Sequence, residues 1–104
     1  SERGSNHGDE PEEHIRRGNE HRSVEEYDEA IECYERAIHA DPSIVLAHFE
    51  KGKTHMEVGE HREAVECFEI VVQLDSKNTE GHKARGDAYQ QLENYKEAVN
   101  CFSK

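Results

Sequence analysis

The stretch Tyr-Asp-Glu-Ala-Ile-Glu-Cys-Tyr-Glu-Arg-Ala-Ile-His-Ala-Asp-Pro, residues 27–42, decides the fold of this chain. Its apolar residues recur at steps of three and four, namely Tyr27, Ala30, Ile31, Tyr34, Ala37 and Ile38. Such spacing places them on one face of an amphipathic helix. Asp41 and Pro42 are a helix stop, and Ser43 is expected to be the N-cap of a following helix. No segment alternates with period two, so no strand is predicted.

The same stretch belongs to a repeat of 34 residues. The three cysteines, Cys33, Cys67 and Cys101, are separated by 34 residues each time. Six further columns keep this register: Gly18, Gly52, Gly86; Ala30, Ala64, Ala98; Tyr34, Phe68, Phe102; His14, His48, His82; Arg17, Lys51, Arg85; and Tyr27, His61, Tyr95. The register predicts a flexible polar leader, residues 1–10, followed by one domain of three units, 11–44, 45–78 and 79–104. In each unit a first helical piece, roughly 12–24, 45–58 or 79–92, precedes the amphipathic second piece.

These columns resemble the tetratricopeptide repeat. The glycine column matches the small residue where the two helices of a unit approach, the alanine column matches the residue facing it, and the aromatic column matches the large packing residue. The resemblance implies an all-α fold, a right-handed α-solenoid of stacked antiparallel helix pairs. His14, His48 and His82 stand where the family usually has a bulky apolar residue, and His21 and His55 depart from it two turns later. We therefore expect a marginally stable solenoid.

The composition fits such a fold and excludes other classes. Only 33% of the residues are apolar, but stacked units share one thin continuous core, which needs few apolar residues per unit. The net charge of −11 argues against a nucleic acid or an anionic membrane surface as partner. Neither a membrane span nor a signal peptide is evident in the sequence. The three cysteines are too few and too evenly spread for a disulfide framework, so we expect reduced thiols and a cytoplasmic location.

No catalytic residue, metal site or cofactor is predicted, and we expect that the protein is not an enzyme. His14 and His21 lie about 10.5 Å apart along a helix axis, too far to share one zinc ion, so the eight histidines are expected to pack at helix seams. The acidic residues between Glu25 and Glu35 are typical of a solvated helix face rather than of acid–base catalysis. No phosphate-binding loop, nucleophile elbow or dinucleotide fingerprint is present.

The resemblance also implies where a partner would bind. In this family the first helix of each unit lines a concave surface that holds an extended or helical peptide. Carried over to this chain, the candidate binding residues are Ile15, Asn19 and Arg22, then Leu46, Phe49, Lys53 and Met56, and finally Lys83, Asp87 and Gln90. The apolar members would hold an apolar anchor, with Lys53 and Lys83 near an acidic group. Alternatively, Phe49 packs on a neighbouring helix, and the sequence leaves both interpretations open.

Charge and the family's known ligands narrow the partner. One branch binds the acidic C-terminal tails of heat-shock chaperones through a clamp of Lys, Asn, Asn, Lys and Arg. Here only Asn19 matches, because the other four positions hold Ile15, Glu50, Glu80 and Ala84. We therefore expect no tight binding of such tails. The leader and the three units carry −2, −6, −3 and 0 charges, so a basic or apolar protein segment is the expected partner.

Two further questions stay open on the sequence alone. The stems of Arg17, Lys51 and Arg85 could cover apolar surface, with Glu13 and Glu20 as partners of Arg17, or their charges could bind a carboxylate of the partner. The second concerns function: the protein is either an interaction module of a scaffold or adaptor, or a self-assembling structural module. In the second case, copies would stack through the uncapped C-terminal helix face that contains Val99 and Phe102.

Overall fold

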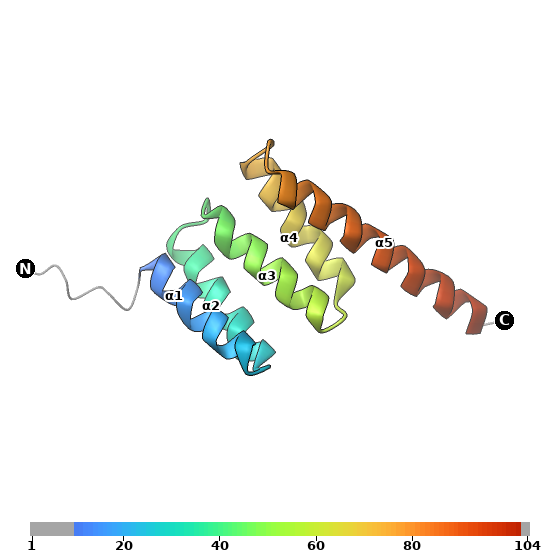
Figure 1. Cartoon of the computed structure of the whole chain (residues 1–104), viewed down its shortest axis with the longest axis horizontal. Coiled ribbons are helices and arrows are strands. Elements are labelled where there is room, and N and C mark those ends of the chain that lie inside the picture. Colours follow the sequence, from blue (N-terminus) through green and yellow to red (C-terminus); the bar gives the residue numbers. More distant parts are fainter. Residues whose placement is uncertain (1–9, 103–104) are drawn as a thin grey trace, which may run out of the picture.

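The computed structural model describes residues 10–102, without the side chains of residues 101 and 102, and every element in this range is helical. The elements are α1 (Pro11–Ser23), α2 (Tyr27–Ala40), α3 (Val45–Glu57), α4 (His61–Leu74) and α5 (Thr79–Phe102). Helices α1 and α2 form one antiparallel hairpin, α3 and α4 form the next, and α5 lies along α4 (Figure 1). This arrangement confirms the all-α solenoid. The predicted leader lies outside the described residues except for Glu10.

Aromatic rings fill the hairpin interiors at the glycine column. A Cβ atom added to Gly18 would lie 2.6 Å from Tyr34 Cε1, and one added to Gly52 would lie 2.6 Å from Phe68 Cε1. Tyr34 and Phe68 are 0% and 1% exposed. Each ring packs directly against the helix backbone at a glycine, where any side chain would clash with it. Burying such a side chain stabilises the fold by roughly 1.5–3 kcal/mol. The aromatic column is therefore buried, as expected for a large packing residue, and it lies against the glycine column, a pairing that the sequence did not specify.

A positive backbone angle and a side-chain hydrogen bond close each of these hairpins. The turn residues Glu25 and Gly59 have φ angles of 65° and 82°. Across the first turn, His21 Nδ1 donates a hydrogen bond to Glu26 Oε1 over 2.7 Å. Across the second turn, His55 Nδ1 donates one to Glu60 Oε1, also over 2.7 Å. The backbone N–H groups of these two glutamates donate to the carbonyl oxygens of the same histidines over 2.8 Å. The second histidine column thus stabilises the turns.

Hydrogen bonds and ion pairs also join one unit to the next. His48 Nε2 donates to the carbonyl oxygen of Pro42 over 2.9 Å, and His82 Nε2 donates to that of Ser76 over 2.7 Å. These bonds hold each connecting loop against the helix that follows it. The prediction that histidines pack at helix seams is therefore right for His48, which is buried, whereas His82 makes the equivalent hydrogen bond while exposed.

The basic column supplies a second contact at the same seams. Lys51 Nζ lies 3.3 Å from Glu35 Oε2, and Arg85 Nη1 lies 3.7 Å from Glu69 Oε1. Each pair links the first helix of a unit to the second helix of the unit before. Arg17 pairs with Glu13, as expected, but not with Glu20, which pairs with Arg16 instead.

The start of α3 differs from the prediction. Helix α2 ends at Ala40, before Asp41 and Pro42, as expected. Ser43 is not the N-cap, because that position belongs to Ile44 and has no side-chain capping bond. Instead, the backbone N–H and the hydroxyl of Ser43 donate to Asp41 Oδ1 over 3.1 and 2.8 Å. The serine therefore stabilises the loop between units rather than the helix.

The third unit is the main correction to the predicted architecture. Separate helical pieces were expected on either side of residues 92–95, but α5 runs without interruption from Thr79 to Phe102 and extends past the end of α4 (Figure 1). By register, the turn residue would be Glu93, with Tyr89 and Asn94 in place of the histidine and glutamate that close the first two turns. The third unit therefore lacks one of the contributions that offset the cost of a positive φ at a non-glycine residue in the first unit.

Candidate partner-binding groove

The first helices of the three units, α1, α3 and α5, are neighbours along one side of the solenoid. They carry all ten residues predicted to bind a partner. The structure gives these residues different surroundings. Ile15 is 4% exposed and packs in the core with Ala30 and Tyr34, so its side chain offers no surface to a partner. Leu46 is 51% exposed, and Gln90 is also exposed.

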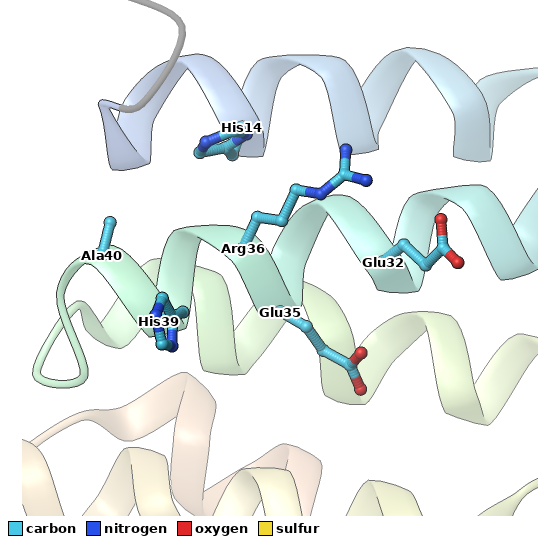
Figure 2. Close-up of a pocket in the computed structure, with 6 residues that line it drawn as sticks. All are labelled: His14, Glu32, Glu35, Arg36, His39 and Ala40. Atoms are coloured by element: carbon cyan, nitrogen blue, oxygen red, sulfur yellow. The ribbon is translucent and has the colours of Figure 1, made fainter. Parts of the chain in front are cut away.

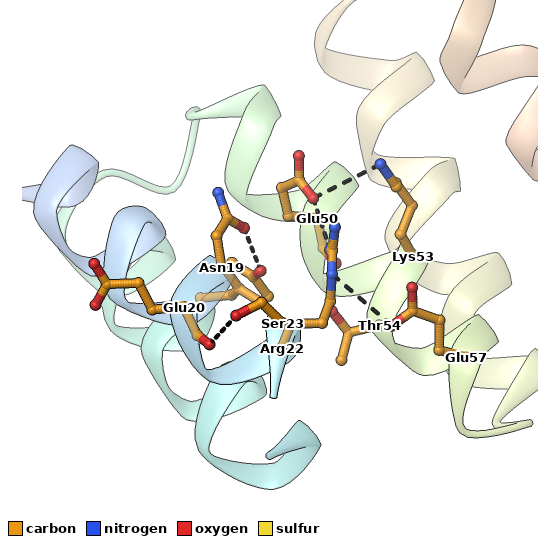
Figure 3. A network of polar contacts seen from close by, with 9 residues as sticks. Asn19, Glu20, Arg22, Ser23, Glu50, Lys53, Thr54 and Glu57 are labelled. Carbon is orange, nitrogen blue, oxygen red and sulfur yellow. Dashed lines mark hydrogen bonds and ion pairs between the residues drawn. The ribbon is translucent and has the colours of Figure 1, made fainter. Parts of the chain in front are cut away.

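A polar network joins α1 to α3 on this side (Figure 3). Arg22 Nη1 donates to Glu50 Oε1 over 2.7 Å and to Thr54 Oγ1 over 3.4 Å. Arg22 Nε lies 3.8 Å from Glu57 Oε1, while Lys53 Nζ lies 3.9 Å from Glu50 Oε1. The side chains of Arg22 and Glu50 are only 19% and 14% exposed. Their charges are therefore largely compensated within the protein.

Burial and neighbouring charges act in opposite directions on Arg22. Burial alone would lower the pKa of its guanidinium, but the hydrogen bond with Glu50 and the nearby negative charges outweigh it and raise the pKa. Asn19, the remaining predicted residue of α1, is exposed and its side-chain oxygen accepts a hydrogen bond from the hydroxyl of Tyr34. The groove residues of α1 thus already have partners within the fold.

The open part of this side is a cavity of about 290 Å³ between α3 and α5. Its lining consists of Phe49, Lys53, Glu80, Lys83, Ala84 and Asp87. Four of these are predicted binding residues. The other two, Glu80 and Ala84, are positions of the chaperone-tail clamp that do not match. The structure therefore brings the α3 and α5 parts of the predicted site together.

Phe49 packs on a neighbouring helix, as one interpretation predicts, and it also lines the cavity, while its role in binding a partner stays a prediction. Its ring packs against Phe68 at a centroid distance of 5.7 Å and a tilt of 53°, and it also lines the cavity. Lys53 Nζ lies 5.2 Å from the centroid of the Phe49 ring, within the range of a cation–π contact. Met56 is half-buried against the core cluster around Phe68 and Ala88, so it supports the cavity wall instead of lining it.

A larger cavity, of about 570 Å³, lies elsewhere, along α2 (Figure 2). Its lining consists of His14, Glu32, Glu35, Arg36, His39 and Ala40. His14 comes from α1 and is 9% exposed, and its Nδ1 atom is buried without a hydrogen-bond partner. Among the described residues, no group of three His, Cys, Asp or Glu side chains could hold a metal ion. The sequence did not indicate this cavity, because its residues come from separate columns of the repeat.

The described cysteines are free thiols. Cys33 and Cys67 are both buried, and burial raises the pKa of the Cys67 thiol to about 11. A thiol with such a pKa is almost fully protonated near neutral pH and is a poor nucleophile. The side chain of Cys101 lies outside the described residues.

Comparisons with known proteins agree with this architecture. A family model described as tetratricopeptide repeat matches residues 11–44, and a second model with the same description matches residues 49–102. The chain belongs to the tetratricopeptide repeat family. No curated protein matches the chain. Over the described residues, no helix of this tetratricopeptide repeat chain is long and apolar enough to cross a membrane.

Several solved structures superpose well on this chain. A crystal structure of MamA protein has a TM-score of 0.79 at 24% identity, and the match covers 91% of this chain and 52% of that one. The chain thus spans about half the length of MamA, and this likeness concerns the fold alone. The second repeat domain of Spaghetti (RPAP3) bound to the HSP90 peptide SRMEEVD has a TM-score of 0.78 at 26% identity, covering 90% and 87%. The second repeat domain of human RPAP3 in complex with the HSP70 peptide SGPTIEEVD has a TM-score of 0.73 at 27% identity. That match covers 89% of this chain and 81% of the RPAP3 chain.

Proposed function

We propose that this chain is a non-catalytic protein–protein interaction module that binds a peptide or helix of a partner protein along α1, α3 and α5. The observation that carries the proposal is the cavity between α3 and α5, where Phe49 and Ala84 offer apolar surface among charged side chains. Membership of a repeat family that generally serves protein interaction supports it. So do the RPAP3 domains, which have the same fold and bind peptides of HSP90 and HSP70.

The cavity suits an apolar anchor better than a strongly charged one. Lys53 and Lys83 are balanced by Glu80 and Asp87 in the same lining, so its formal charge is neutral. Beyond the cavity, towards α1, Arg22 is already paired with Glu50. The first unit keeps its excess of acidic residues, and we therefore expect basic residues of the partner to lie towards that end. A cytoplasmic location also stays a prediction.

An acidic chaperone tail is a poor fit for the same surface. Four clamp positions of this chain do not match the family's clamp. Two of them hold the carboxylates of Glu50 and Glu80, and a third holds Ile15, which is buried. A tail carboxylate would approach Glu80 directly, and like charges brought together at an interface cost several kcal/mol by order of magnitude. The RPAP3 neighbours are therefore evidence for peptide binding by the fold, and not for the same ligand.

The test uses peptides selected from a random dodecapeptide library on the immobilised protein. Each selected peptide is titrated into the ¹⁵N-labelled chain, and amide shifts locate its site. We expect the largest shifts at Phe49, Lys53, Lys83 and Asp87. The change Lys83→Glu should weaken binding of an apolar anchor at least tenfold. It leaves three carboxylates and one ammonium group in the lining, and an apolar side chain that fills the cavity would have to desolvate them.

The matched control is Lys77→Glu, the same change at an exposed lysine that does not line the cavity. It should leave the affinity within about twofold. Shifts confined to α2 and α4, or equal losses of affinity in the two variants, would contradict the proposed site.

Self-assembly is the second candidate function. Its support is the apolar stripe of α5, in which Ala88 and Leu92 pack near α4 while Tyr95, further along the helix, is 61% exposed. Sedimentation velocity over a hundredfold range of concentration decides it. A monomer throughout the range would exclude self-assembly, whereas a mass that doubles and is restored to the monomer by Tyr95→Glu would support it.

A further inference from the structure

The third unit contains the parts of a hairpin that the described conformation does not use. A Cβ atom added to Gly86 would meet nothing within 4 Å, although the same addition at Gly18 or Gly52 would meet a buried aromatic ring. The face of α5 around Gly86 is therefore vacant where the equivalent faces of α1 and α3 are covered by the second helix of their own unit. Vacancy of this face is particular to the third unit.

The segment that would cover this face follows in the same chain. Residues 95–102 repeat the pattern of the second helices, and the register assigns Tyr95, Ala98 and Phe102 to the columns of Tyr27, Ala30 and Tyr34. Ala30 and Ala64 are both 0% exposed, whereas Ala98 is exposed and Tyr95 is 61% exposed. Tyr95 and Ala98, the two residues of this stripe whose side chains the structure describes, are thus exposed in the third unit.

On a continuous helix this segment cannot reach the vacant face. Tyr95 follows Gly86 by nine positions, and a rotation of 100° per residue places the two on opposite sides of α5. For the same reason, two straight α5 helices packed about a twofold axis could not cover both of their Gly86 faces at once. Within one chain, contact between the stripe and the Gly86 face requires a turn, and the register places that turn at Glu93.

We propose that α5 is the open form of a helical hairpin, and that residues 95–102 close onto the Gly86 face by a turn at residues 92–94. The turn has a modest cost, because Glu25 already adopts a φ of 65° at the equivalent position of the first unit. The hydrogen bond across the turn is absent in the described form, because the Tyr89 hydroxyl donates a hydrogen bond to Glu69 Oε2 rather than bonding to residue 94. The two forms therefore differ by one turn and by the burial of one apolar stripe.

The experiment measures one distance in the full chain. The native cysteines are replaced by alanine, and nitroxide labels are placed on cysteines introduced at Glu80 and Asn100, both exposed. An uninterrupted helix holds these positions about 30 Å apart, whereas a closed hairpin brings them to about 15 Å. The reference pair, Leu46 and Glu66, lies one repeat earlier in a hairpin that is closed.

Two variants make the outcome decisive. Combining Tyr89→His, Glu93→Gly and Asn94→Glu gives the third unit the turn residues of the second, and should move all molecules to the reference distance. Ala98→Glu should hold α5 open, because a carboxylate cannot be buried where Ala30 and Ala64 are, while circular dichroism shows the rest of the chain folded. The wild type should give a short-distance component that Ala98→Glu removes.

A long distance alone in both the wild type and the triple variant would overturn the proposal. A short component confined to the triple variant would also overturn it, since the natural α5 would then be held straight. A short distance that appears only at high concentration, together with a doubled mass, would assign the contact to a second copy and refute closure within one chain.

Discussion

The substitution Gly52→Ala tests the packing on which the repeat depends. The added Cβ would lie 2.6 Å from Phe68 Cε1 and 2.9 Å from Cδ1 and Cζ of the same ring. Phe68 is 1% exposed and leans on Phe49, so the ring has little freedom to move away. Overpacking of this kind costs about 1–3 kcal/mol, and the helix preference of alanine over glycine returns about 1 kcal/mol. We expect a net loss of up to about 2 kcal/mol in the free energy of unfolding.

Gly86→Ala is the matched control, because it makes the same change at the same repeat position without a neighbour within 4 Å. While α5 is open, helix preference alone predicts a gain of up to about 1 kcal/mol. Urea titrations followed by circular dichroism at 222 nm compare the two variants with the wild type. If Gly52→Ala proves as stable as Gly86→Ala, the ring moves at little cost, and the packing argument is refuted.

Three further predictions concern the ligand, a turn and a thiol. The peptide SRMEEVD should show no saturable heat of binding at micromolar concentrations in calorimetry, because of Glu50 and Glu80; low-micromolar affinity would contradict the comparison of clamp positions. His55→Ala should lower the free energy of unfolding by about 0.5–1.5 kcal/mol through loss of its bond to Glu60, whereas the exposed His39→Ala should change it by less than about 0.5 kcal/mol. Equal effects of the two substitutions in urea titrations would argue against a role in the turn. Burial raises the pKa of the Cys67 thiol to about 11, so this thiol should react slowly with a disulfide reagent at pH 8. In the Cys33→Ala, Cys101→Ala variant, which keeps only this thiol, the folded protein should react far more slowly than the same variant unfolded in urea. Because the folded pKa is the higher one, stability from this group is lost as pH rises from about 9 to 11; a folded-state rate equal to the unfolded one would refute this account.

The sequence determined the fold class and the repeat of 34 residues. A helix repeats its side-chain directions every few residues, so spacing alone showed which face of α2 is apolar, and the register showed that Gly18 and Gly52, like Tyr34 and Phe68, hold equivalent positions; the structure then showed that each glycine meets the aromatic ring of its own unit. Four of the predicted binding residues, Phe49, Lys53, Lys83 and Asp87, also line one cavity. The reason is that equivalent positions of successive first helices lie side by side in a stack of repeats.

Tertiary structure alone decided which of these groups are available and how the third unit is arranged. Ile15 lies on the predicted helix but is buried, because the neighbouring α2 covers it. Lys51 pairs with Glu35 across a seam that no spacing within one helix specifies. Helix α5 is continuous because a turn depends on a positive φ and on a bond between residues 89 and 94, and not on apolar periodicity. Periodicity is a local property of the chain, whereas burial, ion pairing across units and turn closure depend on which neighbour occupies each face.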